Sequence, residues 1–347
     1  FIYYFNFKKI LYNVSLMIDE KIGTRDKKGD WKPSYLFSYG PLFELPFKPL
    51  TIIKWVFSNP GYILPWLFFY GLVGLIVYLY LTPSLEVTNN FHYSWCLPIL
   101  LRNFILILLW FGFLHFRLYV KKSQSNLYKY NSNYGEGSKE KFLFKNQIYD
   151  NMFLSLVSGS IFISFYEILA LWCYSNNYFS NVNWNDNFIY CLILILLLPL
   201  YKDAHFYTGH RFLHSSVLYK YAHYVHHKNV NPGPWSGLAM HPIEHFIYFS
   251  FFIIFFIVPS HPFHFYFLYG IFLFAPAVHG HSGYEKLMVN KKSGVGTGGH
   301  AHYLHHKYFE CNYGDGNLPL DRWFGTLHDG SDEAQERMIK RMKERRG

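Results

Sequence analysis

Long apolar runs with almost no charge recur through the first part of the chain. Pro60 to Leu81 is a 22-residue run without charge, which as a helix would reach roughly 33 Å and cross a hydrocarbon core. Similar runs occupy Trp95–Phe116, Met152–Tyr174 and the shorter Phe188–Tyr201. Because lipid offers backbone groups no partners, such runs predict helices. We therefore expect four transmembrane spans within residues 59–201.

A last apolar stretch, Phe246–Pro276, is broken by polar and helix-breaking residues, namely Pro259, His261, Pro262 and His264. Each half is short for a crossing, so the pattern favours a re-entrant hairpin. The final residues 331–347 are acidic near their start and basic near their end, which predicts a charged surface helix. The chain thus divides into segments 1–58, 59–201, 202–330 and 331–347.

Lysine and arginine alternate between the loops that join the four runs. Residues 1–58 carry nine, residues 82–94 none, residues 117–149 seven and residues 175–187 none. Positive loops stay on the cytoplasmic side of a membrane. The N-terminal segment, the 117–149 loop and the region after Tyr201 are therefore predicted to face the cytosol.

The composition agrees with a membrane protein: 51% of the residues are hydrophobic, 22% aromatic and only 16% charged, which is too apolar for an ordinary soluble domain. The net charge of +10 lies in the N-terminal segment, one loop and the tail, a pattern that fits membrane orientation better than nucleic acid. Four cysteines without a C-x-x-C pair suggest neither a disulfide framework nor a thiolate zinc site. The opening residues lack a basic region and a cleavage site, so no cleaved signal peptide is expected.

Histidines carry the candidate chemistry. Of 19 histidines, 16 fall between His205 and His306, and three groups have helical spacing. These groups are His210 and His214; His223, His226 and His227; and His302, His305 and His306. Positions i, i+3 and i+4 share one helix face. Eight imidazoles are too many for one ion, so two metals are predicted, and imidazole suits iron, zinc or copper.

Other interpretations of these histidines are weaker. A single pair at this spacing is more often structural, but burying three groups beside a bilayer without a partner would be costly. Haem between membrane helices needs histidines that face each other at depth, whereas these lie just outside the apolar runs. A structural zinc site needs only four ligands and usually recruits thiolates. The predicted fold is an all-α integral membrane bundle with a cytosol-facing, histidine-rich di-metal cap.

Several further residues are candidates for supporting roles. His281, in His-Ser-Gly-Tyr-Glu, can add a ninth ligand if the chain returns to the cluster after the hairpin. Asp203 lies two helical turns before His210, where its carboxylate can fix an imidazole tautomer. The remaining candidates near the metals are His241, Glu244, His245, His279 and Asp321. Five more histidines are interpreted as structural or interfacial: His92, His115, His261, His264 and His328.

Several of these segments resemble the fatty acid hydroxylase superfamily. They are Asp203–His214 (DAHFYTGHRFLH), His223–His227 (HYVHH), His241–Glu244 (HPIE), His281–Tyr284 (HSGY), His302–His306 (HYLHH), Asn312–Gly316 (NYGDG) and Leu320–Thr326 (LDRWFGT). Gly23–Lys27 (GTRDK) and Pro232–Leu238 (PGPWSGL) are similar to the sterol desaturase branch, in its bacterial-type and protist members. The resemblance covers roughly residues 20–335. Its histidine boxes are specific for the superfamily but not for a substrate.

The resemblance implies a di-iron enzyme that uses dioxygen and external electrons to desaturate or hydroxylate a membrane lipid, favouring a sterol. The implied ligands are His210, His214, His223, His226, His227, His281, His302, His305 and His306. Two iron ions are expected, with zinc as an alternative occupant after isolation. A b-type cytochrome with an NAD(P)H reductase would supply electrons, since no haem module or flavin-binding motif is visible in the chain. The family also implies the endoplasmic reticulum, while another organelle or a bacterial inner membrane stays open.

Other functions stay open at this point. The same metal centre would serve a sterol C-4 methyl oxidase, whose box His-Ser-Gly-Tyr-Glu also resembles, or a fatty acyl or sphingolipid hydroxylase. A non-catalytic metal-binding membrane subunit would have the same fold, but intact histidine boxes argue against it. A transporter is suggested only by the intramembrane charges Arg102 and Glu167, and it does not explain the boxes.

Overall fold

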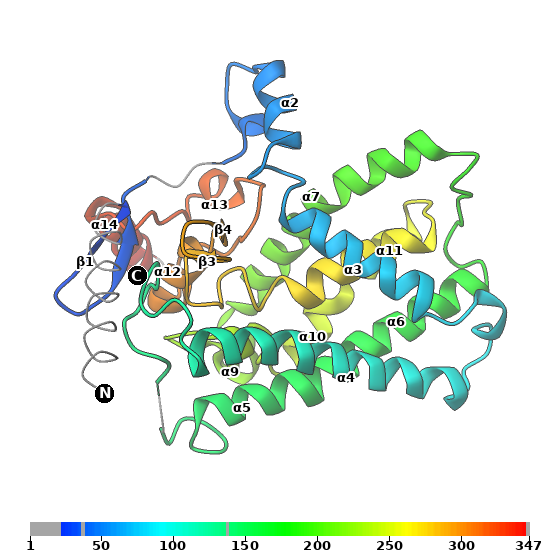
Figure 1. Ribbon diagram of the computed structural model, residues 1–347, viewed down its shortest axis with the longest axis horizontal. Helices are drawn as coiled ribbons and strands as arrows, with labels where there is room; N and C mark the ends of the chain where they lie inside the picture. Colours follow the sequence, from blue (N-terminus) through cyan, green and yellow to red (C-terminus); the bar gives the residue numbers. More distant parts are fainter. Residues whose placement is uncertain (1–21, 36–38, 137–138, 345–347) are drawn as a thin grey trace.

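The computed structural model describes residues 22–35, 39–136 and 139–344, and this part of the chain is mainly helical (Figure 1). The predicted all-α class is confirmed. Two small antiparallel hairpins complete it: β1 (Gly23–Arg25) pairs with β2 (Trp31–Pro33), and β3 (Lys286–Met288) pairs with β4 (Gly294–Gly296). The opening residues to which the signal-peptide expectation refers lie outside the described residues.

Three helical segments are long and apolar enough to cross a membrane, judged by length and composition: Tyr93–Val120, Gln147–Ser175 and Phe188–Leu213. They consist of α4 (Tyr93–His115) with η3 (Phe116–Val120); α5 (Gln147–Phe153) with η4 (Leu154–Gly159) and α6 (Ser160–Ser175); and α7 (Phe188–Leu213). These three segments coincide with three of the predicted runs.

The first predicted run forms a shorter helix than expected. Helix α3 spans Trp66–Tyr80, only 15 residues, and residues 59–65 before it are bends and turns. Pro60 and Pro65 explain the late start, because proline lacks the backbone donor that a helix interior needs. Helix α2 (Pro49–Phe57) precedes this segment. A crossing at this position stays a prediction.

The fourth run, in contrast, forms a longer helix than its apolar residues suggest. Helix α7 continues past Tyr201 to Leu213, through Lys202, Asp203 and His210. Leaving the apolar region does not end a helix, since polar residues with good helix propensity continue it. The apolar segment and the first histidine box therefore share one continuous helix.

The broken apolar stretch forms a helical hairpin. Its arms are α10 (Pro242–Tyr248) with η7 (Phe249–Phe256), and α11 (Pro262–Phe274). At the turn, the Ser260 amide donates a hydrogen bond to the Ser180 carbonyl (2.9 Å), and the Val182 amide donates one to the Ser260 carbonyl (3.3 Å). The turn therefore lies beside the 175–187 loop, which has no lysine or arginine, at the end of the bundle away from α9 and α12. That the hairpin is re-entrant stays a prediction.

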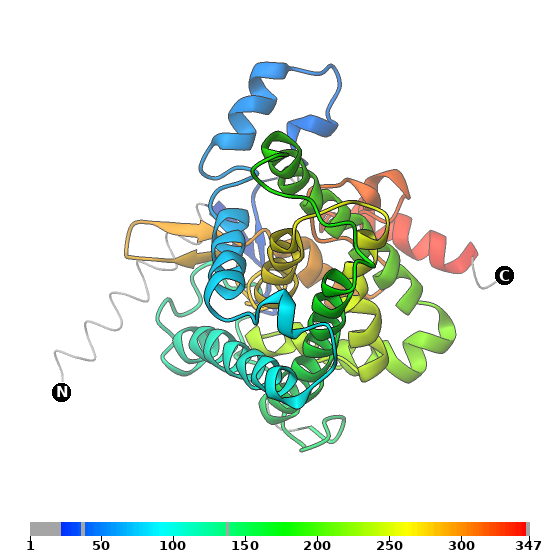
Figure 2. The same cartoon turned by 90° about the vertical axis from the view of Figure 1, so that its right-hand side faces the viewer.

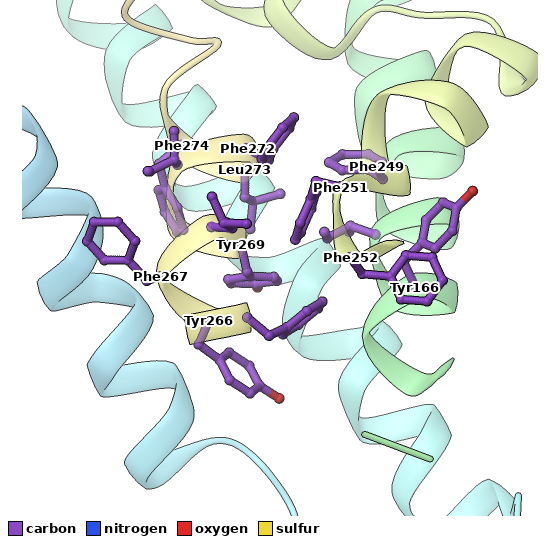
Figure 3. Close-up of a cluster of buried hydrophobic side chains, with 14 of the residues drawn as sticks. Tyr166, Phe249, Phe251, Phe252, Tyr266, Phe267, Tyr269, Phe272, Leu273 and Phe274 are labelled. Carbon is purple, nitrogen blue, oxygen red and sulfur yellow. The ribbon is translucent and has the colours of Figure 1, made fainter. Parts of the chain in front are cut away.

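Helix α11 lies in the middle of the bundle, with α3 beside it (Figure 2). Its side chains are buried on all sides, and its aromatic rings meet those of η7, which in turn contacts Tyr166 of α6 through Phe252 (Figure 3). Gly74 of α3 and Gly270 of α11 allow the two backbones to approach closely: an added Cβ would lie 2.2 Å from the Tyr266 carbonyl oxygen or 2.3 Å from that of Tyr70. Small residues at such crossings are typical of membrane helix packing.

The two intramembrane charges form a pair rather than lining a pathway. Arg102 of α4 contacts Glu167 of α6, whose other oxygen accepts a hydrogen bond from Tyr266 of α11 (2.7 Å). The Asn103 amide donates to Glu167 (3.0 Å) and to Ser164 (2.9 Å). Because an unpaired charge in an apolar surrounding is costly, this cluster holds three helices in register.

The predicted cytosolic loop packs against the histidine-rich region. The Val230 amide donates to Glu136 (2.8 Å), and the Gln147 side-chain amide donates to Asn229 (2.9 Å). The other helices are η1 (Pro41–Phe43), η2 (Leu85–Val87), α8 (Ser216–Leu218), η5 (Tyr219–His223), α9 (Tyr224–His227), η6 (Pro234–Leu238), α12 (His300–Tyr308), α13 (Leu320–Trp323) and α14 (Asp332–Glu344). Helix α14 lies in the predicted charged tail.

The α3–α11 crossing generates a stability prediction. Gly74→Ala forces a methyl group against the α11 backbone, so we expect a loss of about 1–3 kcal/mol in unfolding free energy. Gly112→Ala in α4 is the matched control, because its added Cβ would lie 3.7 Å from Trp235, an ordinary contact. Thermal unfolding of the purified proteins in detergent measures both. Equal midpoints for the two variants would contradict the close approach.

Candidate metal centre

Four parts of the chain bring the predicted ligands together. His210 and His214 lie at the end of α7, the second box in η5 and α9, His281 in the segment after α11, and the third box in α12. Helices α9 and α12 lie on the side of the molecule that also carries β3 and β4 (Figure 1). The boxes therefore meet although about 90 residues separate the first from the last.

The nine histidines form two groups, each with its ring nitrogens within 4.8 Å of one another. One group is His210, His214, His223, His227 and His305, and the other is His226, His281, His302 and His306. The closest Nε2···Nε2 distances are 3.0 Å in the first group, for His227 with His223 and with His305, and 3.1 Å in the second, for His281 with His306. The second and third boxes each contribute to both groups. The first box and His281 each contribute to one group only.

These distances fit the edges of a coordination shell. Two nitrogens about 2.1 Å from one ion, at octahedral or tetrahedral angles, lie roughly 3.0–3.4 Å apart. Mutual hydrogen bonds do not explain the arrangement: the Nε2 atom of His214 lies 3.1–3.3 Å from those of three other histidines, whereas a neutral imidazole has one N–H. The donor sets therefore fit one cation per group.

Burial keeps these imidazoles in the form that binds metal. Of the nine, only His214 is not fully buried. Desolvation, with neighbouring imidazoles as a further cause, holds the pKa of His226, His227 and His302 well below the usual value, and desolvation lowers the pKa of His281 to about 4. A neutral imidazole has a free lone pair, so the site needs no deprotonation at neutral pH to receive a cation.

Backbone carbonyls fix the orientation of three rings. The Nδ1–H groups of His210, His281 and His305 donate to the carbonyls of Tyr313 (2.7 Å), Pro276 (3.0 Å) and Cys311 (2.6 Å), respectively. Because a carbonyl can only accept, the proton lies on Nδ1 and the lone pair on Nε2. Each of these rings therefore directs its lone pair into its group.

Two of the predicted supporting carboxylates act near the ligands. Glu244 accepts a hydrogen bond from His223 Nδ1 (2.9 Å) and is buried. Asp321 acts one step further out, because it accepts hydrogen bonds from the backbone amides of Tyr313 (2.9 Å) and Gly314 (2.7 Å). It thereby holds the carbonyl on which His210 depends.

Asp203 does not have the role that its helical spacing predicted. Its Oδ2 accepts hydrogen bonds from the amides of Asn317 (2.6 Å) and Leu318 (3.2 Å), and Lys202 lies 3.5 Å from its other oxygen. Two turns of α7 separate it from His210, a distance that a short aspartate side chain does not span. Asp203 instead anchors the loop that follows α12.

The three additional histidines lie at different distances from the groups. His241 caps α10, where its Nδ1 accepts from the Ile243 amide (3.2 Å). His245 contacts the Ser158 hydroxyl (2.8 Å) and stacks on Phe249. His279 donates to the Thr297 carbonyl (2.5 Å) and lines the cavity beside the groups. Only His279 adjoins the site.

A cavity adjoins both histidine groups. Its polar lining includes ligands of both groups together with His205, Glu244, His279 and Asp315, and its apolar lining is Phe206, Leu213, Met240, Ile247, Tyr248 and Pro276. The Glu244 Oε2 atom is buried and has no hydrogen-bond partner among the described residues. The cavity next to the histidine groups is therefore mainly apolar, with the Glu244 carboxylate in its wall.

Several contributors to the site escape prediction from the sequence. The backbone carbonyls of Pro276, Cys311 and Tyr313 cannot be recognised in the sequence, since every residue has a backbone carbonyl. His205 and Asp315 line the cavity. Only Asp315 has a local signal, the Asn-Tyr-Gly-Asp-Gly segment.

A helical bundle with membrane-length apolar helices and two all-histidine groups defines a class of membrane-bound, histidine-ligated metalloproteins. Residues 195–326 match the family model Fatty acid hydroxylase, and this segment contains all nine histidines. The predicted resemblance to the fatty acid hydroxylase superfamily is thereby confirmed.

The relatives support the sterol desaturase branch. A Delta(7)-sterol 5(6)-desaturase of Gibberella zeae is 37% identical over 144 residues, 41% of this chain and 38% of that protein. Those of Candida glabrata and Nicotiana tabacum are 29% and 28% identical and cover 56% and 46% of this chain, 54% and 57% of their own. The chain spans about two fifths of the length of the first relatives it matches. No solved structure matches it significantly.

The division into two groups generates a metal-content prediction. His305→Ala removes a donor from the group of five and His302→Ala removes one from the group of four, so each variant should fall from about two ions per chain to about one. His241→Ala, a helix cap away from both groups, is the control and should keep the full content. Elemental analysis of the purified proteins measures this. Unchanged content in both site variants would rule out the grouping.

Proposed function

We propose that the protein is a dioxygen-dependent di-iron oxidoreductase of membrane lipids, and specifically a sterol desaturase. The observation that carries the proposal is the pair of neutral imidazole groups beside one largely apolar cavity. The family match and the relatives named sterol 5(6)-desaturases favour a sterol over an acyl chain and desaturation over C-4 methyl oxidation. The nine histidines are the proposed iron ligands.

The bound irons would supply the oxidising power that removes hydrogen from an unactivated C–H bond. The chain holds the irons and positions the lipid. Fixed imidazoles hold the ions without thiolates, which an oxidant would attack. Glu244 and the carbonyls of Cys311 and Tyr313 keep ligand rings from rotating. The apolar cavity wall excludes water and holds the lipid against the metals.

Desaturation in this scheme needs an external reductant. Removing two hydrogens from the lipid while dioxygen becomes two waters takes up two further electrons and two protons. We propose that a separate protein, such as a b-type cytochrome with an NAD(P)H reductase, delivers these electrons.

We further propose an endoplasmic reticulum protein with four crossings and the histidine site on the cytosolic face. The contacts of the lysine-rich 117–149 loop with the histidine-rich region support this, for example the Val230 amide with Glu136 (2.8 Å). Both parts then lie on one side of the membrane. The side with more lysine and arginine is the cytosolic one.

The test is expression in a yeast that makes sterols but lacks its own sterol C5(6)-desaturase. We expect a sterol two mass units lighter than its precursor to accumulate, measured by mass spectrometry, and His226→Ala to abolish it. Loss of an outer partner of a ligand alone typically lowers activity about 10–100-fold, so loss of a ligand itself should lower it at least as much. A product with an added oxygen would instead indicate hydroxylation. Unchanged lipids from a chain that carries its full iron content would contradict the proposed function.

A further inference from the structure

An apolar groove on the outside of the bundle borders a chamber that in turn borders the metal centre. The groove lies between α3, α7 and α11 and is lined by residues such as Leu67, Phe68, Leu196 and Phe267. Phe68 is 56% exposed and Leu196 is 38% exposed. Since α7 is one of the membrane-length helices, this groove faces the lipid.

A polar chamber continues inward from the groove. The groove and the chamber share the lining residues Tyr62 and Leu67, and the chamber shares His279, His302 and Asp315 with the cavity at the metal groups. The three spaces are therefore neighbours, in series from the lipid-facing surface to the histidines, with these shared side chains between them. Tyr62 lies at the first junction, where its hydroxyl donates to the Leu196 carbonyl (2.7 Å).

The chamber differs from the groove in its chemistry. Lys202 pairs with Asp315 (2.6 Å), and Asp203 lies beside them. Lys202 and Asp203 directly follow the apolar run of α7, so the chamber lies at the level where this helix leaves the lipid. A lone hydroxyl group entering it finds both donors and acceptors, which offset the cost of its burial.

From this arrangement we propose that a sterol enters sideways from the bilayer between α3 and α7, hydroxyl end first. The Lys202–Asp315 pair binds the 3-hydroxyl of the sterol in the chamber. The aliphatic side chain of the sterol stays in the α3–α7 groove. A sterol fits this series of spaces because it is apolar along its length and polar at one end. An acyl lipid would instead enter with its apolar end first, or would leave its headgroup outside the chamber. The inference rests on the proposed function for its substrate class.

Ring carbons close to the hydroxyl are thereby the ones next to the metals. The bond between carbons 5 and 6 starts at the ring junction nearest the 3-hydroxyl. The chamber therefore selects the reacting bond by its distance from the hydroxyl. Sterol esters and ethers, which lack the free hydroxyl, are excluded.

Photolabelling of the full-length protein in nanodiscs tests the route. The probe is a Δ7-sterol with a diazirine at the end of its side chain, and labelled peptides are mapped by mass spectrometry. We expect labelling on α3 and α7. Leu67→Trp blocks the junction and should reduce labelling by about tenfold. The control Leu79→Trp is exposed, lies near the other end of α3 and does not line the groove, so it should leave labelling unchanged.

A second measurement tests the hydroxyl contact. In the unmodified protein we expect the free sterol probe to be preferred about tenfold over its 3-methyl ether. Asp315→Asn keeps the shape of the side chain but weakens the ion pair, so this preference should be lost. The iron content of the variant should not change. Labelling elsewhere, or equal labelling of Leu67→Trp and Leu79→Trp, would overturn the route even if sterol turnover is observed. Labelling at the groove without any turnover would support the route and contradict the proposed function.

Discussion

Nine uncharged imidazoles cannot converge in a buried space unless something electron-poor lies between them. Their Nε2 lone pairs point at one another at 3.0–3.3 Å, and the rings cannot satisfy each other as hydrogen-bond donors. A bound cation in each group turns this mutual repulsion into attraction. Much of the rest of the chain serves to place four distant segments around these two points and to keep them there.

The bundle meets this demand by fixing the segments from outside. The Arg102–Glu167 pair and Tyr266 join α4, α6 and α11 deep in the apolar region, while Asp321 and Asp203 hold the loop after α12 against α7. The cavity walls come from α7, α10, α12 and the segment after α11. Ligand geometry and cavity shape are thus consequences of one packing arrangement, and neither can change alone.

The sequence predicts the ligands well and their arrangement poorly. Spacing alone selects eight histidines, because i, i+3 and i+4 positions must share a helix face. It does not divide them: His226 and His227 are neighbours yet belong to different groups, which only tertiary packing decides. Apolar runs locate the long helices, but not the late start of α3 after Pro65 or the continuation of α7 to Leu213. Asp203 was assigned to the wrong partner because a shared face does not ensure that a side chain reaches.

Helix α7 joins the lipid region and the first histidine box without interruption. A continuous helix fixes the distance between its two ends, because each residue advances about 1.5 Å along the axis and turns about 100°. The number of residues between Phe188 and His210 therefore sets the distance of the metal site from the hydrocarbon region of the membrane. Which carbon of a lipid reaches the metals then depends on how far the lipid moves out of the membrane. The choice of carbon therefore depends on the thickness of the bilayer.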